Sequence, residues 1–197
     1  ASRLPAGWRW ESFRGVEVGV PGDWGWGNGT QRLTQWCIGK AAEKAAKLAP
    51  DANTKVLSLA LEARACAAVS MGQTQSPRLA VIDYSLPSTT PRLWVFDLAA
   101  NKLLFREVVA HGQGTGENMA RNFSNKDGSH QSSIGLFRTA DTYIGHNGYS
   151  LRMQGLEPGF NDAAMARAIV IHGAPYVNAK MAQQKGRLGR SWGCPAL

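Results

Sequence analysis

Short alternations of apolar and polar residues dominate the second half of the chain, whereas the first half has helical composition. Residues 40–48 are rich in alanine and lysine, and Asn53 is placed to cap a second helix over 54–71. Seven later runs have strand-like composition: Leu79–Tyr84, Arg92–Leu98, Lys102–Ala110, Ser133–Thr139, Thr142–Ile144, Tyr149–Gln154 and Arg167–Ile171. The pattern predicts a mainly β domain of the α+β class, preceded by a helical lead-in.

The connections between these runs differ in length and composition. Ala99–Asn101 predicts a hairpin turn, whereas residues 111–130 are rich in glycine, asparagine and serine and predict a long loop. Loops of that length inside a compact domain often carry function. The last predicted helix covers Pro175–Lys185, with Gly186 just past its end.

The first 39 residues have a composition of their own, with five of the seven tryptophans and eight glycines. A short strand is predicted over Val16–Val20. Exposed tryptophan stacks on sugar rings, but tryptophan is more often a core or docking residue. We therefore divide the chain into residues 1–39 of unknown role, a helical lead-in over 40–72 and a catalytic domain over 73–197.

The 197 residues carry a formal charge of +8 and are 44% hydrophobic, which is typical of a globular protein. No apolar run approaches the roughly 20 residues of a membrane span, and no signal peptide opens the sequence. Residues 163–197 hold five basic side chains and no acidic one. Such a segment favours an anionic partner, and a solvated basic face is the alternative.

The three cysteines, Cys37, Cys66 and Cys194, match no metal or redox spacing. The count allows two arrangements: a disulfide between Cys37 and Cys66 with Cys194 free, or three buried, reduced thiols. The four histidines stand in no HxH or HExxH relation, so no metal site is expected. His111 precedes the glycine-rich loop and is predicted to hold that loop in place.

The glycines at 112, 114 and 116 do not make a dinucleotide site. Their spacing is GxGxG, and no acidic residue stands about 20 positions further on. No phosphate-binding GK[ST] occurs, and no nucleic-acid-binding motif accompanies the basic charge. We expect neither a cofactor nor a nucleic-acid partner.

One histidine and one cysteine remain as chemistry-bearing residues. His172 ends the most apolar run and is expected at the surface, while Cys194 follows glycine in a loop. Pro195 is suited to the first position of a helix, which predicts Cys194 at its N-cap. The helix dipole, together with Arg187 and Arg190, is then expected to lower the pKa of the thiol.

Two segments resemble the catalytic signature of the L,D-transpeptidases, the YkuD-like family. They are Ile171–Tyr176, with a strand ending in His-Gly, and Gly189–Cys194, with Ser-x-Gly-Cys; the continuation Cys-Pro-Ala-Leu is similar to one branch of the family. Further segments fit in order: 82–85, 93–98, 110–112, 128–137 and 155–162. The resemblance covers about Pro50 to Leu197 and implies a β-sandwich or barrel domain.

The resemblance implies cysteine acyl transfer on peptidoglycan stem peptides, with release of D-alanine. Cys194 is then the nucleophile, His172 the general base and later acid, and the Gly173 carbonyl the group that orients the imidazole. The backbone N–H groups of Cys194 and Gly193 are expected to form the oxyanion hole. Four residues are candidates to bind substrate: Arg190, Ser191, Trp192 and Tyr149.

The family pattern also implies a helix and strand after the nucleophile, so a truncated chain is expected. An extracytoplasmic, bacterial and monomeric enzyme follows from the resemblance, without metal or cofactor. Two alternatives stay open: an L,D-carboxypeptidase or amidase using the same dyad, and an inactive module that binds the cell wall.

Overall fold

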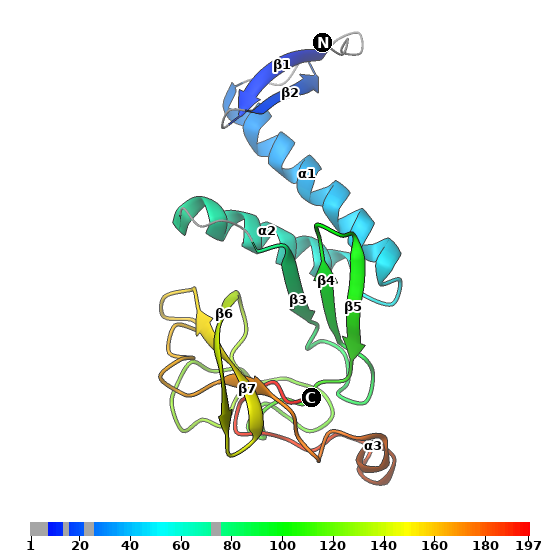
Figure 1. The fold of residues 1–197 in the computed structure, drawn as a ribbon, viewed down its shortest axis with the longest axis vertical. Helices are drawn as coiled ribbons and strands as arrows, with labels where there is room; N and C mark the ends of the chain where they lie inside the picture. The colour runs from blue at the N-terminus through cyan, green and yellow to red at the C-terminus, as the bar shows by residue number, and fades with distance from the viewer. Residues whose placement is uncertain (1–7, 14–15, 22–25, 72–75) are drawn as a thin grey trace.

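The computed structural model describes residues 8–13, 16–21, 26–71 and 76–197. An antiparallel hairpin, β1 (Trp8–Phe13) and β2 (Val16–Pro21), precedes the helices α1 (Trp26–Leu48) and α2 (Thr54–Met71). Figure 1 shows the hairpin at the outer end of α1. The predicted strand at 16–20 and helix at 54–71 are confirmed, whereas the helix predicted at 40–48 is only the end of α1.

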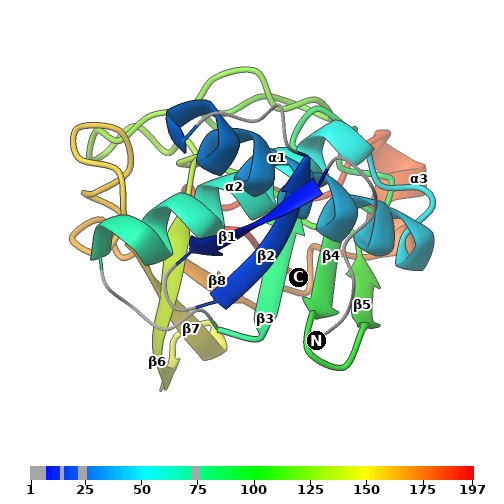
Figure 2. The same ribbon diagram turned by 90° about the horizontal axis from the view of Figure 1, so that it is seen from above.

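The first three-stranded sheet carries the helical lead-in on one face (Figures 1 and 2). It consists of β3 (Arg78–Ile82), β4 (Leu93–Asp97) and β5 (Lys102–Glu107) in antiparallel order. The predicted turn between β4 and β5 is confirmed, and Asn101 adopts φ 52° there. Asparagine tolerates this left-handed conformation better than most residues, which suits it to the turn.

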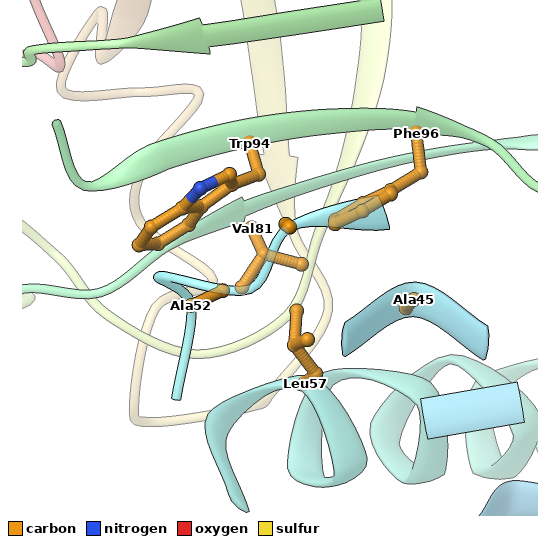
Figure 3. Packing of buried hydrophobic residues seen from close by; sticks show 7 residues of the cluster. Ala45, Ala52, Leu57, Val81, Trp94 and Phe96 are labelled. Carbon is orange, nitrogen blue, oxygen red and sulfur yellow. The ribbon is translucent and has the colours of Figure 1, made fainter. Parts of the chain in front are cut away.

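A hydrophobic core joins the two helices to this sheet. Its buried members are Ala45, Ala49, Ala52, Leu57, Val81, Trp94 and Phe96. Figure 3 shows Leu57 of α2 and Ala45 of α1 pointing toward Val81 and the two aromatic rings of β4. Small alanines on α1 let the helix approach the large rings closely, so the lead-in shares one core with β3 and β4.

The second sheet pairs β6 (Phe137–Gly145), β7 (Gly148–Gly155) and β8 (Val170–His172) in antiparallel order. The strands predicted at 133–139 and 142–144 belong to one strand, β6, with an irregularity between Thr139 and Thr142. This strand begins at Phe137, so the predicted start at Ser133 is wrong. The strand predicted from Arg167 is wrong at its start. Turn hydrogen bonds engage the Arg167 and Ala168 amides, and Ala168 has φ 53°, so pairing begins only at Val170.

The short helix α3 (Ala179–Lys185) follows β8. It begins later than the predicted Pro175 because the Asn178 side chain accepts a hydrogen bond from the Met181 amide and caps it. Gly186 ends the helix with φ 64°, as predicted. Within the described residues, the sheets together with α1, α2 and α3 confirm a mainly β fold of the α+β class with a helical lead-in.

Candidate active site

The last residues of the chain form a ladder beside β8 and place Cys194 near the start of this strand, where its Sγ approaches the Ala168 carbonyl. Ala196 bridges Ala110 on one side and His172 on the other. The Leu197 amide donates to the His172 carbonyl at 2.8 Å, and the Ala110 amide donates to the Ala196 carbonyl at 2.8 Å. These residues are extended, so the predicted helix with Cys194 at its N-cap is wrong. Figure 1 shows this end of the chain between β7 and the lower end of β5.

His172 occupies the last position of β8 with only 4% of its surface exposed. The expectation of a surface ring is therefore wrong, because Ser150 of β7 and the C-terminal ladder flank the residue. His172 Nδ1 lies 2.8 Å from the Gly173 carbonyl oxygen. A carbonyl only accepts, so Nδ1 carries the proton and Nε2 is left as the basic nitrogen.

Cys194 is partly buried against an apolar cluster that contains Met153, Ala164 and Ile169. Its Sγ lies 3.8 Å from the Ala168 carbonyl, within hydrogen-bond distance for sulfur. Burial raises the pKa of the Cys194 thiol, while a backbone hydrogen bond at Val170 and the Arg167 charge act in the opposite direction. The predicted lowering of this pKa by a helix dipole, Arg187 and Arg190 is therefore wrong.

Arg187 and Arg190 are both paired with Glu117, at 2.6 and 2.7 Å. Arg190 also donates to the Gln113 and Gly116 carbonyls. The acid-free sequence around Cys194 suggested a local positive field, but a carboxylate from the glycine-rich loop neutralises part of it. Two arginines nevertheless face one carboxylate, which leaves an excess of positive charge beside the nucleophile loop.

Ser191 shapes the nucleophile loop from within. Its hydroxyl donates to the Cys194 carbonyl at 2.6 Å and accepts the Gly193 N–H at 3.1 Å. Its backbone pairs with the glycine-rich loop, since the Ser191 amide donates to His111 and its carbonyl accepts from Gln113. Gly193 has φ 125°, a conformation that glycine adopts readily. Ser191 thus holds the loop, and the Gly193 N–H is already engaged.

The aromatic substrate-binding candidates lie in different settings. Trp192 is 73% exposed and stacks on His130, with ring centroids 5.1 Å apart. Tyr149 is 69% exposed on β7, but its neighbour Ser150 is the residue paired with His172. Because side chains alternate along a strand, Tyr149 lies on the opposite face from His172. Trp192 is therefore the candidate beside the nucleophile.

A buried polar network supports the glycine-rich loop, and only its histidine was predictable from the sequence. Arg92 is fully buried and donates to the Leu86 and Val109 carbonyls and to His111 Nδ1. His111 Nε2 then lies 3.3 Å from the Gly116 carbonyl. The prediction that His111 holds this loop is confirmed. Arg92 stands in a strand-like run, and nothing local in the sequence marks it as a partner of His111.

The network makes stability dependent on pH. Burial, together with the Arg92 charge, lowers the pKa of His111 to about 4. The unfolded chain takes up a proton near pH 6.5 that the folded protein resists until about pH 4. The contribution of His111 to the free energy of unfolding should be constant above pH 6.5 and fall by about 3 kcal/mol between pH 6.5 and 4. Urea unfolding across this range measures the effect.

Histidine substitutions isolate that contribution from acidic groups elsewhere. In His111→Gln the pH-dependent loss should shrink, because the side chain no longer titrates. His146→Gln is the matched control, since His146 is exposed in the turn between β6 and β7. An identical pH slope in wild type and His111→Gln would contradict the assignment.

The cysteines are unpaired in the structure. Cys37, Cys66 and Cys194 are all free thiols, so the Cys37–Cys66 disulfide does not form. Cys37 and Cys66 are exposed, so the expectation of three buried thiols is wrong as well. In the described ranges, no three His, Cys, Asp or Glu side chains gather as a metal site. None of the helices there is long and apolar enough to cross a membrane.

Comparisons with known proteins add one finding. Residues 48–197 match a family model described as the L,D-transpeptidase catalytic domain. The match begins at the end of α1, so it includes α2, which shares a core with β3 and β4. A comparison with curated proteins gave no match, and neither did a comparison with solved structures.

Proposed function

Since the chain belongs to the family of L,D-transpeptidase catalytic domains, we propose that it acylates Cys194 with a peptidoglycan stem peptide. The observation that supports this most is the ladder of Ala196 with His172, which joins the end of β8 to the cysteine loop. The Gly173 carbonyl fixes the His172 tautomer that leaves Nε2 free to accept a proton. Cys194 and His172 thus serve as nucleophile and base, and Gly173 orients the base.

The proposed reaction has two steps. His172 Nε2 takes the thiol proton while Sγ attacks the carbonyl carbon between the L and D centres. The amide bond breaks, the proton passes to the departing D-alanine amine, and a Cys194 thioester remains. An amine of a second stem peptide then attacks the thioester and forms a new amide, while its proton returns through His172 to the thiol.

Oxyanion stabilisation is proposed for the backbone N–H groups of Cys194 and Gly193. One such donor typically lowers the barrier by about 2.7–4 kcal/mol. Because the Gly193 N–H is donated to Ser191 Oγ, its use requires exchange of this internal bond for the substrate oxygen. Ser191 therefore acts in positioning, and we retain Trp192 and Arg190 as the groups that meet substrate.

The acceptor is tested by product analysis. Incubation with a stem tetrapeptide should release D-alanine, and addition of a second stem with a free amine should give a cross-linked dimer by mass spectrometry. Release of D-alanine with tripeptide as sole product, with or without the amine, would instead indicate an L,D-carboxypeptidase. Binding to peptidoglycan without turnover would indicate a wall-binding module. We propose that the enzyme is extracytoplasmic, since the proposed substrate lies outside the membrane. We also propose that it is monomeric, as the resemblance to the family implies.

Arg190 is proposed to bind a carboxylate of the stem, in competition with Glu117. Arg190→Gln should raise KM about tenfold, because a hydrogen bond to a charged group contributes about 1.5–3 kcal/mol. Glu117→Gln removes the internal carboxylate that both arginines bind and should lower KM. Steady-state kinetics on a stem tetrapeptide measure both variants.

The opposite changes in KM expected for Arg190→Gln and Glu117→Gln distinguish substrate binding from support of the loops. If the ion pairs only hold the two loops together, both substitutions should impair the enzyme alike. Arg152→Gln is the control, since it removes a comparable exposed pair with Asp141 on the second sheet. Its KM should equal that of wild type.

A further inference from the structure

Arg167 binds four acceptors on one loop. Its Nη1 donates to the Ser124 carbonyl at 2.6 Å and to Ser133 Oγ at 2.7 Å. Its Nη2 donates to the Gln131 carbonyl at 2.8 Å and to Ser129 Oγ at 3.2 Å. The planar guanidinium therefore fixes residues 124–133, which carry no regular secondary structure.

The loop that Arg167 holds lies directly against the nucleophile segment. A Cβ atom built on Gly193 would meet the Gln131 carbonyl oxygen at 2.9 Å. The neighbouring Ser132 accepts a hydrogen bond from the Gly112 amide at 3.0 Å. A shift of residues 131–132 would therefore be transmitted to Gly193 and to the glycine-rich loop.

The residues after Arg167 touch the nucleophile from the other side. Ala168 has φ 53°, which is costly for a residue with a Cβ atom, and its carbonyl lies 3.8 Å from Cys194 Sγ. Ile169 packs in the same cluster as Cys194. Ala168 and Ile169 therefore both contact Cys194. The strained Ala168 backbone is held between Arg167, which is fixed by its hydrogen bonds, and Ile169, which is packed in the apolar cluster.

Few titratable groups of the described residues face Cys194. Tyr84 and Tyr176 interact electrostatically with Cys194 from two other segments. His172 stands two residues after Val170, whose backbone hydrogen-bonds the thiol. Burial raises the pKa of both tyrosines, to about 12 for Tyr84, so they are neutral near pH 7. Arg167 is the permanent cation that opposes the effect of burial on the pKa of Cys194, and Asp127 interacts with it.

We propose that Arg167 is a positioning residue for Cys194. The Arg167 guanidinium fixes residues 124–133 against Gly193 and supplies the permanent positive charge that favours the thiolate. This role replaces the one expected for Arg187 and Arg190, whose charges Glu117 engages. The inference rests on the proposed function only in taking Cys194 as the nucleophile.

The test measures the reactivity of the thiol without any substrate. In a background of Cys37→Ser and Cys66→Ser, which removes the two exposed thiols, iodoacetamide alkylates only Cys194. The rate constant is followed from pH 6 to 11. Loss of an opposite charge should move the midpoint of Arg167→Gln up by about one pH unit. The thiolate fraction, and with it the rate at pH 7, should then fall about tenfold.

Arg167→Lys distinguishes charge from loop support. Lysine keeps the positive charge but lacks the planar guanidinium that binds four acceptors. The midpoint of alkylation in Arg167→Lys should therefore stay within a few tenths of a pH unit of wild type. The control Arg152→Gln, on the exposed pair with Asp141, should leave the profile unchanged. Thermal unfolding records the stability of each variant.

An unchanged midpoint in Arg167→Gln overturns the proposal, and so does an equal upward shift in Arg167→Lys. If Arg167→Gln does not fold, Arg167→Lys still tests the proposal: a wild-type midpoint supports it, and an upward shift of about one pH unit overturns it. Failure of the proposed function shows differently, as turnover of stem peptide that survives Cys194→Ser, and this leaves the alkylation profile intact.

Discussion

Replacing Cys194 by serine is expected to lower the rate of acyl-enzyme formation by about three to four orders of magnitude. A hydroxyl is far less acidic than a thiol, and the apolar contacts with Met153 and Ile169 offer nothing that would ionise it. Intact mass spectrometry after incubation with a stem tetrapeptide, or with a carbapenem, should show the covalent adduct in wild type and none in the variant.

The same chemical change at the other cysteines provides the control. Cys37 and Cys66 are exposed on α1 and α2, so a protein with serine at both positions should form the adduct at the wild-type rate. His172→Gln should slow adduct formation strongly, because glutamine cannot take the thiol proton. If Cys194→Ser gained the same added mass as wild type at the same rate, the nucleophile assignment would be refuted.

The parts of the fold that follow from local pattern were predictable. The bounds of α2 are those expected from the Asn53 cap, whose side chain accepts a hydrogen bond from the Lys55 amide. Strands β3 and β4 lie within one to two residues of the predicted runs, because apolar β-branched and aromatic residues there enter a buried sheet. Cys194 and His172 were also candidates on local sequence, since each stands in a short contiguous segment that resembles the pattern expected for the family.

The predictions that were wrong concern contacts between residues distant in the chain. Pro195 is a good first residue of a helix, yet its neighbour Ala196 pairs with Ala110 and His172. The pairing of Arg187 with Glu117 equally joins two loops that no sequence pattern connects. Local propensity is a weak prior, and tertiary pairing overrides it at these positions.

The charge near the nucleophile shows the same limit. The last 35 residues contain five basic side chains and no acidic one. Of these, Arg167 donates its hydrogen bonds to residues 124–133. Sequence spacing could not separate it from Arg187 and Arg190. Ala168, whose backbone is left-handed, stands between Arg167 and β8, and no local sequence pattern marks this conformation.

Two glycines meet where the glycine-rich loop crosses the nucleophile loop. A Cβ atom built on Gly112 would contact the His130 carbonyl oxygen and lie 2.8 Å from Gly193 Cα. All of these neighbours are backbone atoms, so no side-chain rotation relieves the overlap. Gly112 also bridges Ser191, and its amide donates to Ser132 Oγ, so it cannot move alone.

Gly112→Ala should therefore displace Gly193 and slow acylation of Cys194 about 100-fold, since a misplacement near 1 Å can cost that much. Overpacking should also lower the free energy of unfolding by about 1–3 kcal/mol. Adduct formation by mass spectrometry and urea unfolding measure the two effects. The matched control is Gly39→Ala in α1, where an added Cβ meets nothing within 4 Å. Alanine favours a helix over glycine by about 0.5–1 kcal/mol, so the control should be stabilised and fully active. Wild-type acylation in Gly112→Ala would show that the nucleophile loop does not depend on this contact.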